Sequence, residues 1–190
     1  VNTPVGQYNI FCFRANILNT NPNYAYNFVN GTLTIGKNML TVTANNKSRV
    51  YGDTNPAFDY TITGFVNGQN SSVLTTAPSC TSAANATSGV SGSPYAITCS
   101  GAVATNYAFN YVDGDLAITS AAVTVTADNN TRVYGDSNPT FTYTASGLKN
   151  GEDKSVLGPI TCTSVGPTSS VAGSPYPITC SGDTNANYTV

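Results

Sequence analysis

Charged side chains are scarce in this sequence. Only 8% of its 190 residues are Asp, Glu, Lys or Arg, and the formal net charge is −2, whereas an average soluble protein has about 25% charged residues. Nucleic-acid binding needs clustered Lys and Arg to displace counterions from phosphates, so this composition argues against it. Thr, Ser, Asn and Gly must cover the surface instead, which also argues against a cytosolic enzyme.

The residues on which most enzymes and metal sites depend are missing too. Histidine and tryptophan are absent, and Glu152 is the only glutamate. There is therefore no Ser-His-Asp or Cys-His set, no carboxylate pair within a motif, and no Cys-x-x-Cys spacing for zinc. Asp113-Gly114-Asp115 suits a turn better than calcium ligation, because calcium needs several converging oxygens. We predict no enzyme, no cofactor and no metal site.

Long apolar runs are also missing. No segment approaches the roughly 18 apolar residues of a membrane helix, no signal segment opens the chain, and residue 1 is not Met. We therefore expect no membrane-spanning segment, and we expect this sequence to be a window cut from a longer chain. Disorder is not expected, because hydrophobic residues reach 40% and their pattern is periodic.

What the sequence does contain is a repeat. Arg49–Pro56 recurs as Arg132–Pro139, 83 positions later, and the match extends in both directions. Each copy holds a Tyr-Gly-Asp turn followed by Asn-Pro, a combination that suits turn geometry and stops strand pairing. The turn residues are Tyr51, Gly52, Asp53, Asn55 and Pro56 in the first copy, and Tyr134, Gly135, Asp136, Asn138 and Pro139 in the second.

The same offset divides the chain into three parts. Tyr24–Ile35 matches Tyr107–Ile118, so residues 1–36 are predicted to be the C-terminal half of a β module. Residues 37–119 form a complete module (the middle repeat), and residues 120–190 form a module that lacks its last strand (the third repeat). Repeats of about 80 residues support only a marginal core, and their very short junctions restrict how far neighbours swing.

Five cysteines follow this division. Cys80 and Cys99 flank 18 residues in the middle repeat, and Cys162 and Cys180 flank 17 in the third. We predict one disulfide in each repeat and hence an oxidising compartment. Cys12 occupies the position of Cys99 and Cys180, so we expect its partner upstream of this window rather than a free thiol or a link between chains.

The apolar pattern predicts strands in every repeat. Leu40, Val42 and Ala44 alternate with threonines, and no segment keeps a 3.6-residue period. Tyr107–Ile118 predicts a closing hairpin with its turn at Asp113-Gly114, and residues 71–74 predict one helical turn. We expect an all-β chain of small antiparallel modules, either immunoglobulin-like sandwiches or β-grasp-like, each with at most one short helical turn.

The order of short motifs is also informative. Val-Tyr-Gly-Asp-x-Asn-Pro-x-Phe-x-Tyr is followed by Gly-Phe-Val-Asn-Gly, Ser-Val-Leu, Gly-Ser-Pro-Tyr-x-Ile-Thr, Asn-Tyr and Gly-x-Leu-x-Ile. This series resembles the YGX-type MBG repeats of bacterial surface proteins, tandem modules of large secreted adhesins. The resemblance covers residues 37–190 directly and residues 1–36 by register. It implies an extracellular, mostly β, structural or adhesive segment with no catalytic residues, and the cysteine pairs depart from the general pattern.

Two functions follow from these observations. The first is a disulfide-stapled shaft segment of a long extracellular bacterial adhesin or surface fibre. Its partners are the neighbouring modules and, in a filament version, copies of the same chain, because the weakly charged strand edges permit strand addition. The alternative is an adhesive module that binds surface glycans or a host or cell receptor through exposed tyrosines. Tyrosines that recur at the same repeat positions are better explained by half-buried packing on sheets, so we favour the shaft.

Overall fold

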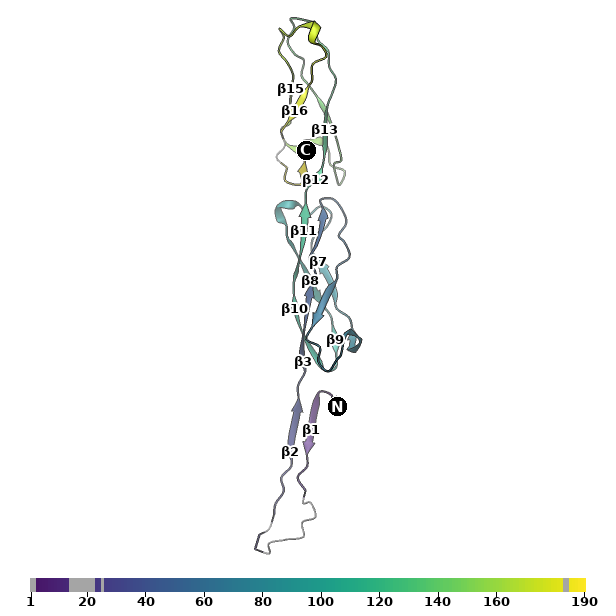
Figure 1. The fold of residues 1–190 in the computed structure, drawn as a ribbon, viewed down its shortest axis with the longest axis vertical. Helices are drawn as coiled ribbons and strands as arrows, with labels where there is room; N and C mark the ends of the chain where they lie inside the picture. The colour runs from purple at the N-terminus through teal and green to yellow at the C-terminus, as the bar shows by residue number, and fades with distance from the viewer. Residues whose placement is uncertain (1–2, 14–22, 25, 183–184) are drawn as a thin grey trace. The chain divides into compact units, whose positions relative to one another are not determined.

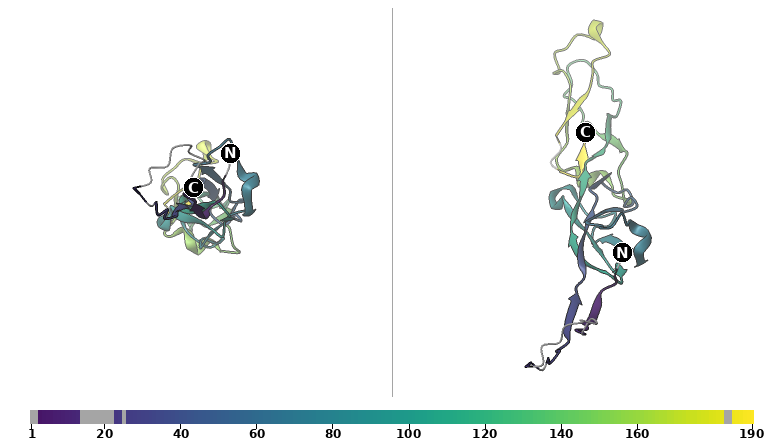
Figure 2. Two further views of the ribbon diagram at one scale, coloured as in Figure 1. Left: turned by 90° about the horizontal axis from the view of Figure 1, so that it is seen from below. Right: turned by 60° about the horizontal axis from the view of Figure 1, so that its bottom comes forward.

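The computed structural model describes residues 3–13, 23–24, 26–182 and 185–190, and these residues are all-β, as predicted. They contain strands and short 3-10 turns but no α-helix (Figure 1; Figure 2 gives two further views). None of their helical turns is long and apolar enough to cross a membrane. The turns are η1 (Ser71–Val73), η2 (Val90–Gly92), η3 (Lys154–Leu157) and η4 (Val171–Gly173). The middle and third repeats thus have two such turns each, where we expected at most one.

The chain divides into two compact units. The first comprises residues 1–44, 59–80 and 98–112, and the second comprises residues 45–58, 81–97 and 113–190. The boundary between the units therefore runs through the middle repeat.

In the first unit, two strands pair by themselves and three others form a mixed sheet. β1 and β2 are antiparallel and lie side by side (Figure 1). β3 lies between β10, which is parallel to it, and β5, which is antiparallel, while β6 pairs with β9. The strands are β1 (Gly6–Ile10), β2 (Gly31–Ile35), β3 (Asn38–Ala44), β5 (Tyr60–Thr63), β6 (Leu74–Thr76), β9 (Val103–Ala104) and β10 (Tyr107–Val112).

The alternation in β3 sets the core of this unit. Leu40, Val42 and Ala44 are buried, because a strand points every second side chain to the same face. Leu40 packs with Ala104 of β9 and Tyr107 of β10.

The second unit is built around a four-stranded sheet of order β4–β11–β8–β7. β11 pairs in parallel with β4 and antiparallel with β8, and its residues alternate strictly between buried and exposed. β7 and β8 each pass from one unit to the other. The four strands are β4 (Lys47–Val50), β7 (Ser79–Ser82), β8 (Tyr95–Ser100) and β11 (Gly114–Thr119).

The third repeat adds three two-stranded sheets to this unit. β13 pairs with β14 and β15 with β16, both antiparallel, and β12 pairs in parallel with β17. The strands are β12 (Ala121–Ala122), β13 (Thr124–Ala127), β14 (Tyr143–Ser146), β15 (Thr161–Thr163), β16 (Thr179–Ser181) and β17 (Tyr188–Thr189).

The predicted closing hairpin over Tyr107–Ile118 is wrong. β10 pairs with β3 and β11 pairs with β4, so the two strands are not partners. Only Asp113 separates them, and one residue is too short for a hairpin loop, which needs at least two. Each strand instead adds in parallel to a strand far upstream, which makes the sheets mixed.

Candidate functional site at the junction of the middle and third repeats

The Tyr-Gly-Asp turn of the middle repeat lies at the start of the third repeat. The Tyr51 N–H donates to the Thr119 carbonyl at 2.8 Å, at the end of β11, and the Asp53 N–H donates to the Val50 carbonyl at 3.2 Å. Gly52 between them has φ 82°, a conformation that glycine adopts without steric cost. The turn leaves Tyr51 only 3% exposed.

An apolar core seals this junction. The Tyr51 ring packs edge-on against Tyr188 of β17, with ring centroids 5.5 Å apart and an interplanar angle of 85°. Such aromatic pairs contribute about 0.5–1.5 kcal/mol beyond the area that they bury. The buried residues of this core come from both repeats: Tyr51, Ile118, Ala121, Val123, Leu157 and Tyr188.

The only glutamate of the chain holds both tyrosines. The Tyr51 hydroxyl donates to Glu152 Oε1 at 2.7 Å, and the Tyr188 hydroxyl donates to Glu152 Oε2. The Lys149 N–H donates in turn to the Tyr188 hydroxyl at 2.9 Å. The hydrogen bond to Glu152 raises the pKa of Tyr51. Burial, followed by the bond to Glu152, raises the pKa of Tyr188 to about 12. Both phenols therefore stay protonated donors at neutral pH.

Polar contacts surround this core. Lys149 Nζ lies 3.0 Å from Asp53 Oδ1, an exposed ion pair that contributes at most about 1 kcal/mol. The Val90 N–H donates to Asn187 Oδ1 at 2.8 Å. A Cβ added at Gly52 would overlap the Lys149 side chain, so the glycine also permits the close approach of the two repeats.

Arg49 and Asn55 brace the turn from within the middle repeat. Arg49 is 7% exposed, and its Nε donates to Asn55 Oδ1 at 2.8 Å. Asn55 Nδ2 donates to the Ala84 carbonyl at 2.7 Å, and Pro56 follows half-buried. These contacts fix the turn against the loop after β7 and so hold Tyr51 at the junction.

The sequence model of the MBG domain (YGX type) matches residues 40–117 and again residues 123–190. The chain belongs to the MBG domain family. No curated protein matches the chain, and no solved structure does. The two matched segments confirm the tandem MBG repeats that the motif order predicts, and the junction described above lies between them.

The MBG domain over residues 123–190, called the third domain because it lies in the third repeat, carries the same turn. Gly135 has φ 91°, the Asp136 N–H donates to the Val133 carbonyl at 3.2 Å, and Asn138 Nδ2 donates to the Val165 carbonyl at 2.9 Å. Tyr134, however, is 62% exposed. Pro139 is half-buried, as Pro56 is. The MBG turn therefore forms locally, and Tyr51 is buried by the residues of the next MBG domain that pack on it.

The start of the middle MBG domain has a similar set of polar groups. The Tyr107 hydroxyl donates to Gln69 Oε1, and the Val66 N–H donates to that hydroxyl at 3.3 Å. The Val5 N–H donates to Asn106 Oδ1 at 3.0 Å. Tyr107, Gln69 and Asn106 thus occupy the positions of Tyr188, Glu152 and Asn187. The two MBG domains therefore begin with similar sets of polar groups.

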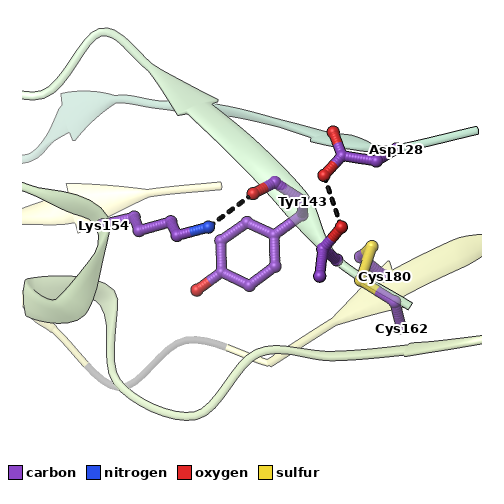
Figure 3. The surroundings of a disulfide bond; sticks show 6 residues. Asp128, Tyr143, Lys154, Cys162 and Cys180 are labelled. Atoms are coloured by element: carbon purple, nitrogen blue, oxygen red, sulfur yellow. Dashed lines mark hydrogen bonds between the residues drawn. A yellow bond between two sulfur atoms is a disulfide. The ribbon is translucent and has the colours of Figure 1, made fainter. Parts of the chain in front are cut away.

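Disulfides join Cys80 to Cys99 and Cys162 to Cys180, which indicates that this MBG pair folds in an oxidising environment. Near the second disulfide (Figure 3), Lys154 Nζ donates to the Tyr143 carbonyl at 2.8 Å and lies 4.6 Å from the centre of its ring.

Cys12 is exposed and forms no disulfide within the described part of the chain. Its pairing with a cysteine upstream of residue 1 stays a prediction. The described residues contain no cluster of three or more acidic or cysteine side chains placed to hold a metal ion.

Proposed function

We propose that this chain is a segment of the shaft of a long extracellular surface protein, in which MBG domains act as spacers joined end to end. The two disulfides support an extracellular location, because such bonds persist in oxidising compartments. The observation that carries the proposal is the shared carboxylate at the junction, where Glu152 of one domain holds Tyr51 of the other together with Tyr188.

This junction suits a spacer because it resists bending. Domains joined by a few polar contacts move freely by default, whereas here a buried tyrosine passes from one domain into the core of the next. Only Ser120 lies between β11 and β12, and its hydroxyl lies 2.6 Å from that of Thr189. A hinge motion between the domains would have to break the contacts of Tyr51 and the Ser120–Thr189 contact at the same time.

The adhesive alternative gains no support from these tyrosines. Tyr51, Tyr107 and Tyr188 are buried, and Tyr60 and Tyr95 are half-buried. A glycan platform needs exposed aromatic faces, so these five tyrosines are better explained by packing within and between the domains; their repeat mates Tyr24 and Tyr134, in contrast, are 69% and 62% exposed.

The spacer function can be tested by measuring how independently the two domains tumble. In dilute solution, ¹⁵N relaxation of the chain should give the middle and third domains one common rotational behaviour. Tyr51→Ala should separate their correlation times, because it removes the ring and the donor that cross the junction. Tyr134→Ala is the matched control, since it changes the same turn at an exposed site. Unchanged tumbling in Tyr51→Ala would refute the spacer function.

A further inference from the structure

The chain enters and leaves the middle MBG domain through strands that pair in parallel. It enters through β3 and leaves through β10 and then β11. β10 pairs in parallel with β3 over six residue pairs, which begin with Asn38 and Tyr107. β11 pairs in parallel with β4 over four residue pairs, which end with Val50 and Thr119. Two residues join β3 to β4 and one joins β10 to β11, so tension in the chain reaches both pairs.

The direction of these strands decides how tension acts on their hydrogen bonds. A pull along the chain draws β3 by its N-terminal end and draws β10, through β11, by its C-terminal end. In a parallel pair these two ends lie at opposite ends of the ladder. The pull therefore slides one strand along the other and loads all the bonds between them together. β4, drawn through β3, and β11, drawn from Ser120, are loaded in the same way.

One further hydrogen bond continues each ladder, and buried side chains shield both. The Asn38 N–H donates to the Asn106 carbonyl at 3.0 Å, and the Tyr51 N–H donates to the Thr119 carbonyl at 2.8 Å. Water competes for the backbone groups of a strand that begins to slide, so burial of the strands slows their rupture. The fully buried side chains of β3 and β11 are Leu40, Val42 and Leu116.

The same arrangement recurs at the start of the third repeat. β12 pairs in parallel with β17, and Ala121 occupies the position of Asn38 by the 83-residue offset. The Ala121 N–H donates to the Asn187 carbonyl at 2.9 Å, as the Asn38 N–H donates to the Asn106 carbonyl. Because Ser120 alone joins β11 to β12, tension passes from a parallel pair of one domain directly into a parallel pair of the next.

We propose that the middle MBG domain bears tension, and that its β3–β10 and β4–β11 pairs together form the clamp that resists it. This inference rests on the proposed spacer function, because a shaft is pulled along its length whenever the parts that it connects are drawn apart. The segment from β5 to β9 lies outside the direct path of tension and contains the Cys80–Cys99 disulfide. The disulfide therefore limits how far a ruptured domain extends, whereas the clamp decides when it ruptures.

Pulling the full chain in two directions tests the clamp. In a Cys12→Ser background, DNA handles are attached to the thiols introduced by Gly36→Cys and Ser120→Cys, and optical tweezers pull them apart. A Cβ at Gly36 meets no other atom within 4 Å. The control combines Gly36→Cys with Thr63→Cys, at the exposed end of β5. Because β5 is antiparallel to β3 and pairs Thr63 with Thr41, the control pull peels these strands apart one bond at a time.

The two pulls should differ in force. At the same loading rate, the pull between residues 36 and 120 should need at least about twice the force of the peeling pull, since forced unfolding follows the unfolding rate and shear must break many bonds at once. Both double variants should keep the melting temperature of the Cys12→Ser chain, because their thiols lie outside the buried core. Equal rupture forces would overturn the clamp. They would leave the spacer function standing, since the tumbling experiment tests that function separately.

Reduction of the disulfide gives a second test with the same handles. Cys80 and Cys99 are 19 positions apart in the sequence, so their disulfide withholds about 60 Å of chain from a ruptured domain. Dithiothreitol should therefore lengthen the extension step between residues 36 and 120 by about 60 Å, while the rupture force stays above that of the peeling pull. A rupture force that falls to the level of the peeling pull would show that the disulfide, and not the parallel strands, carries the tension.

Discussion

Replacing Glu152 by alanine should open the junction between the two MBG domains. The change removes the acceptor of both the Tyr51 and the Tyr188 hydroxyls. A hydrogen bond to a charged group contributes about 1.5–3 kcal/mol. Glu152 is only half-buried, so water will reach part of the vacated space, and the lower end of the range applies to each bond. The expected loss is about 3 kcal/mol.

Hydrogen exchange measures this loss at the junction itself. The Ala121 and Val123 N–H groups donate at 2.9 Å to the Asn187 and Thr189 carbonyls, so their exchange reports local opening. A loss of about 3 kcal/mol should speed their exchange by about a hundredfold, because each 1.4 kcal/mol is a factor of about ten. Amides of β3 in the first unit serve as the internal reference and should change little.

The matched variant is Glu152→Gln, which keeps an acceptor oxygen and copies the natural Gln69 at the start of the middle MBG domain. It should accelerate exchange at Ala121 and Val123 by no more than about tenfold, since a neutral acceptor weakens the bonds without removing them. If the alanine and glutamine variants exchange at the same rate, or if alanine changes exchange by less than about threefold, the shared carboxylate does not hold the junction.

Three further changes test other parts of the structure. In denaturant unfolding, Gly52→Ala should destabilise the protein by at least about 1 kcal/mol more than Gly135→Ala. Both glycines have positive φ, but only at Gly52 would the new Cβ overlap the Lys149 side chain. Stability should fall as pH rises from 10 to about 12, because Tyr188 loses its proton in the unfolded chain at a lower pH than in the folded chain. Tyr188→Phe should reduce this decrease in melting temperature with pH. Replacing Cys162 and Cys180 by serine should cost the third domain about 3 kcal/mol in thermal unfolding, because the loop that they close is no longer restrained in the unfolded chain.

The sequence was sufficient to predict the all-β class and the tandem MBG repeats, because alternation and the 83-residue offset are local or periodic signals. It failed for β10 and β11, because period-2 alternation marks a strand but not its partner. It also could not locate the junction. Tyr51 and Tyr134 share the same local sequence and the same turn, yet they are 3% and 62% exposed, because burial depends on a domain that only one of them meets. One sequence signal could have pointed to the junction: Glu152 is the only glutamate of the chain, and the equivalent position one repeat earlier holds Gln69, which is also a hydrogen-bond acceptor.

The two MBG domains have the same Tyr-Gly-Asp turn, but the residues at their starts, where such a turn can pack, differ. Both turns contain an aspartate, Asp53 in one and Asp136 in the other. At its start the third domain has Lys149 and Glu152, whereas the middle domain has Val66 and Gln69 at the same positions. A Tyr-Gly-Asp turn on the middle domain would therefore lose the ion pair, about 1 kcal/mol at most, and would exchange a charged acceptor for a neutral one, a further difference of about 1 kcal/mol. The junction between the middle and third domains should therefore be stronger than one formed on the polar groups at the start of the middle domain. It should also weaken more as salt concentration rises, because it includes the Lys149–Asp53 ion pair and Val66 offers no counterpart to Lys149.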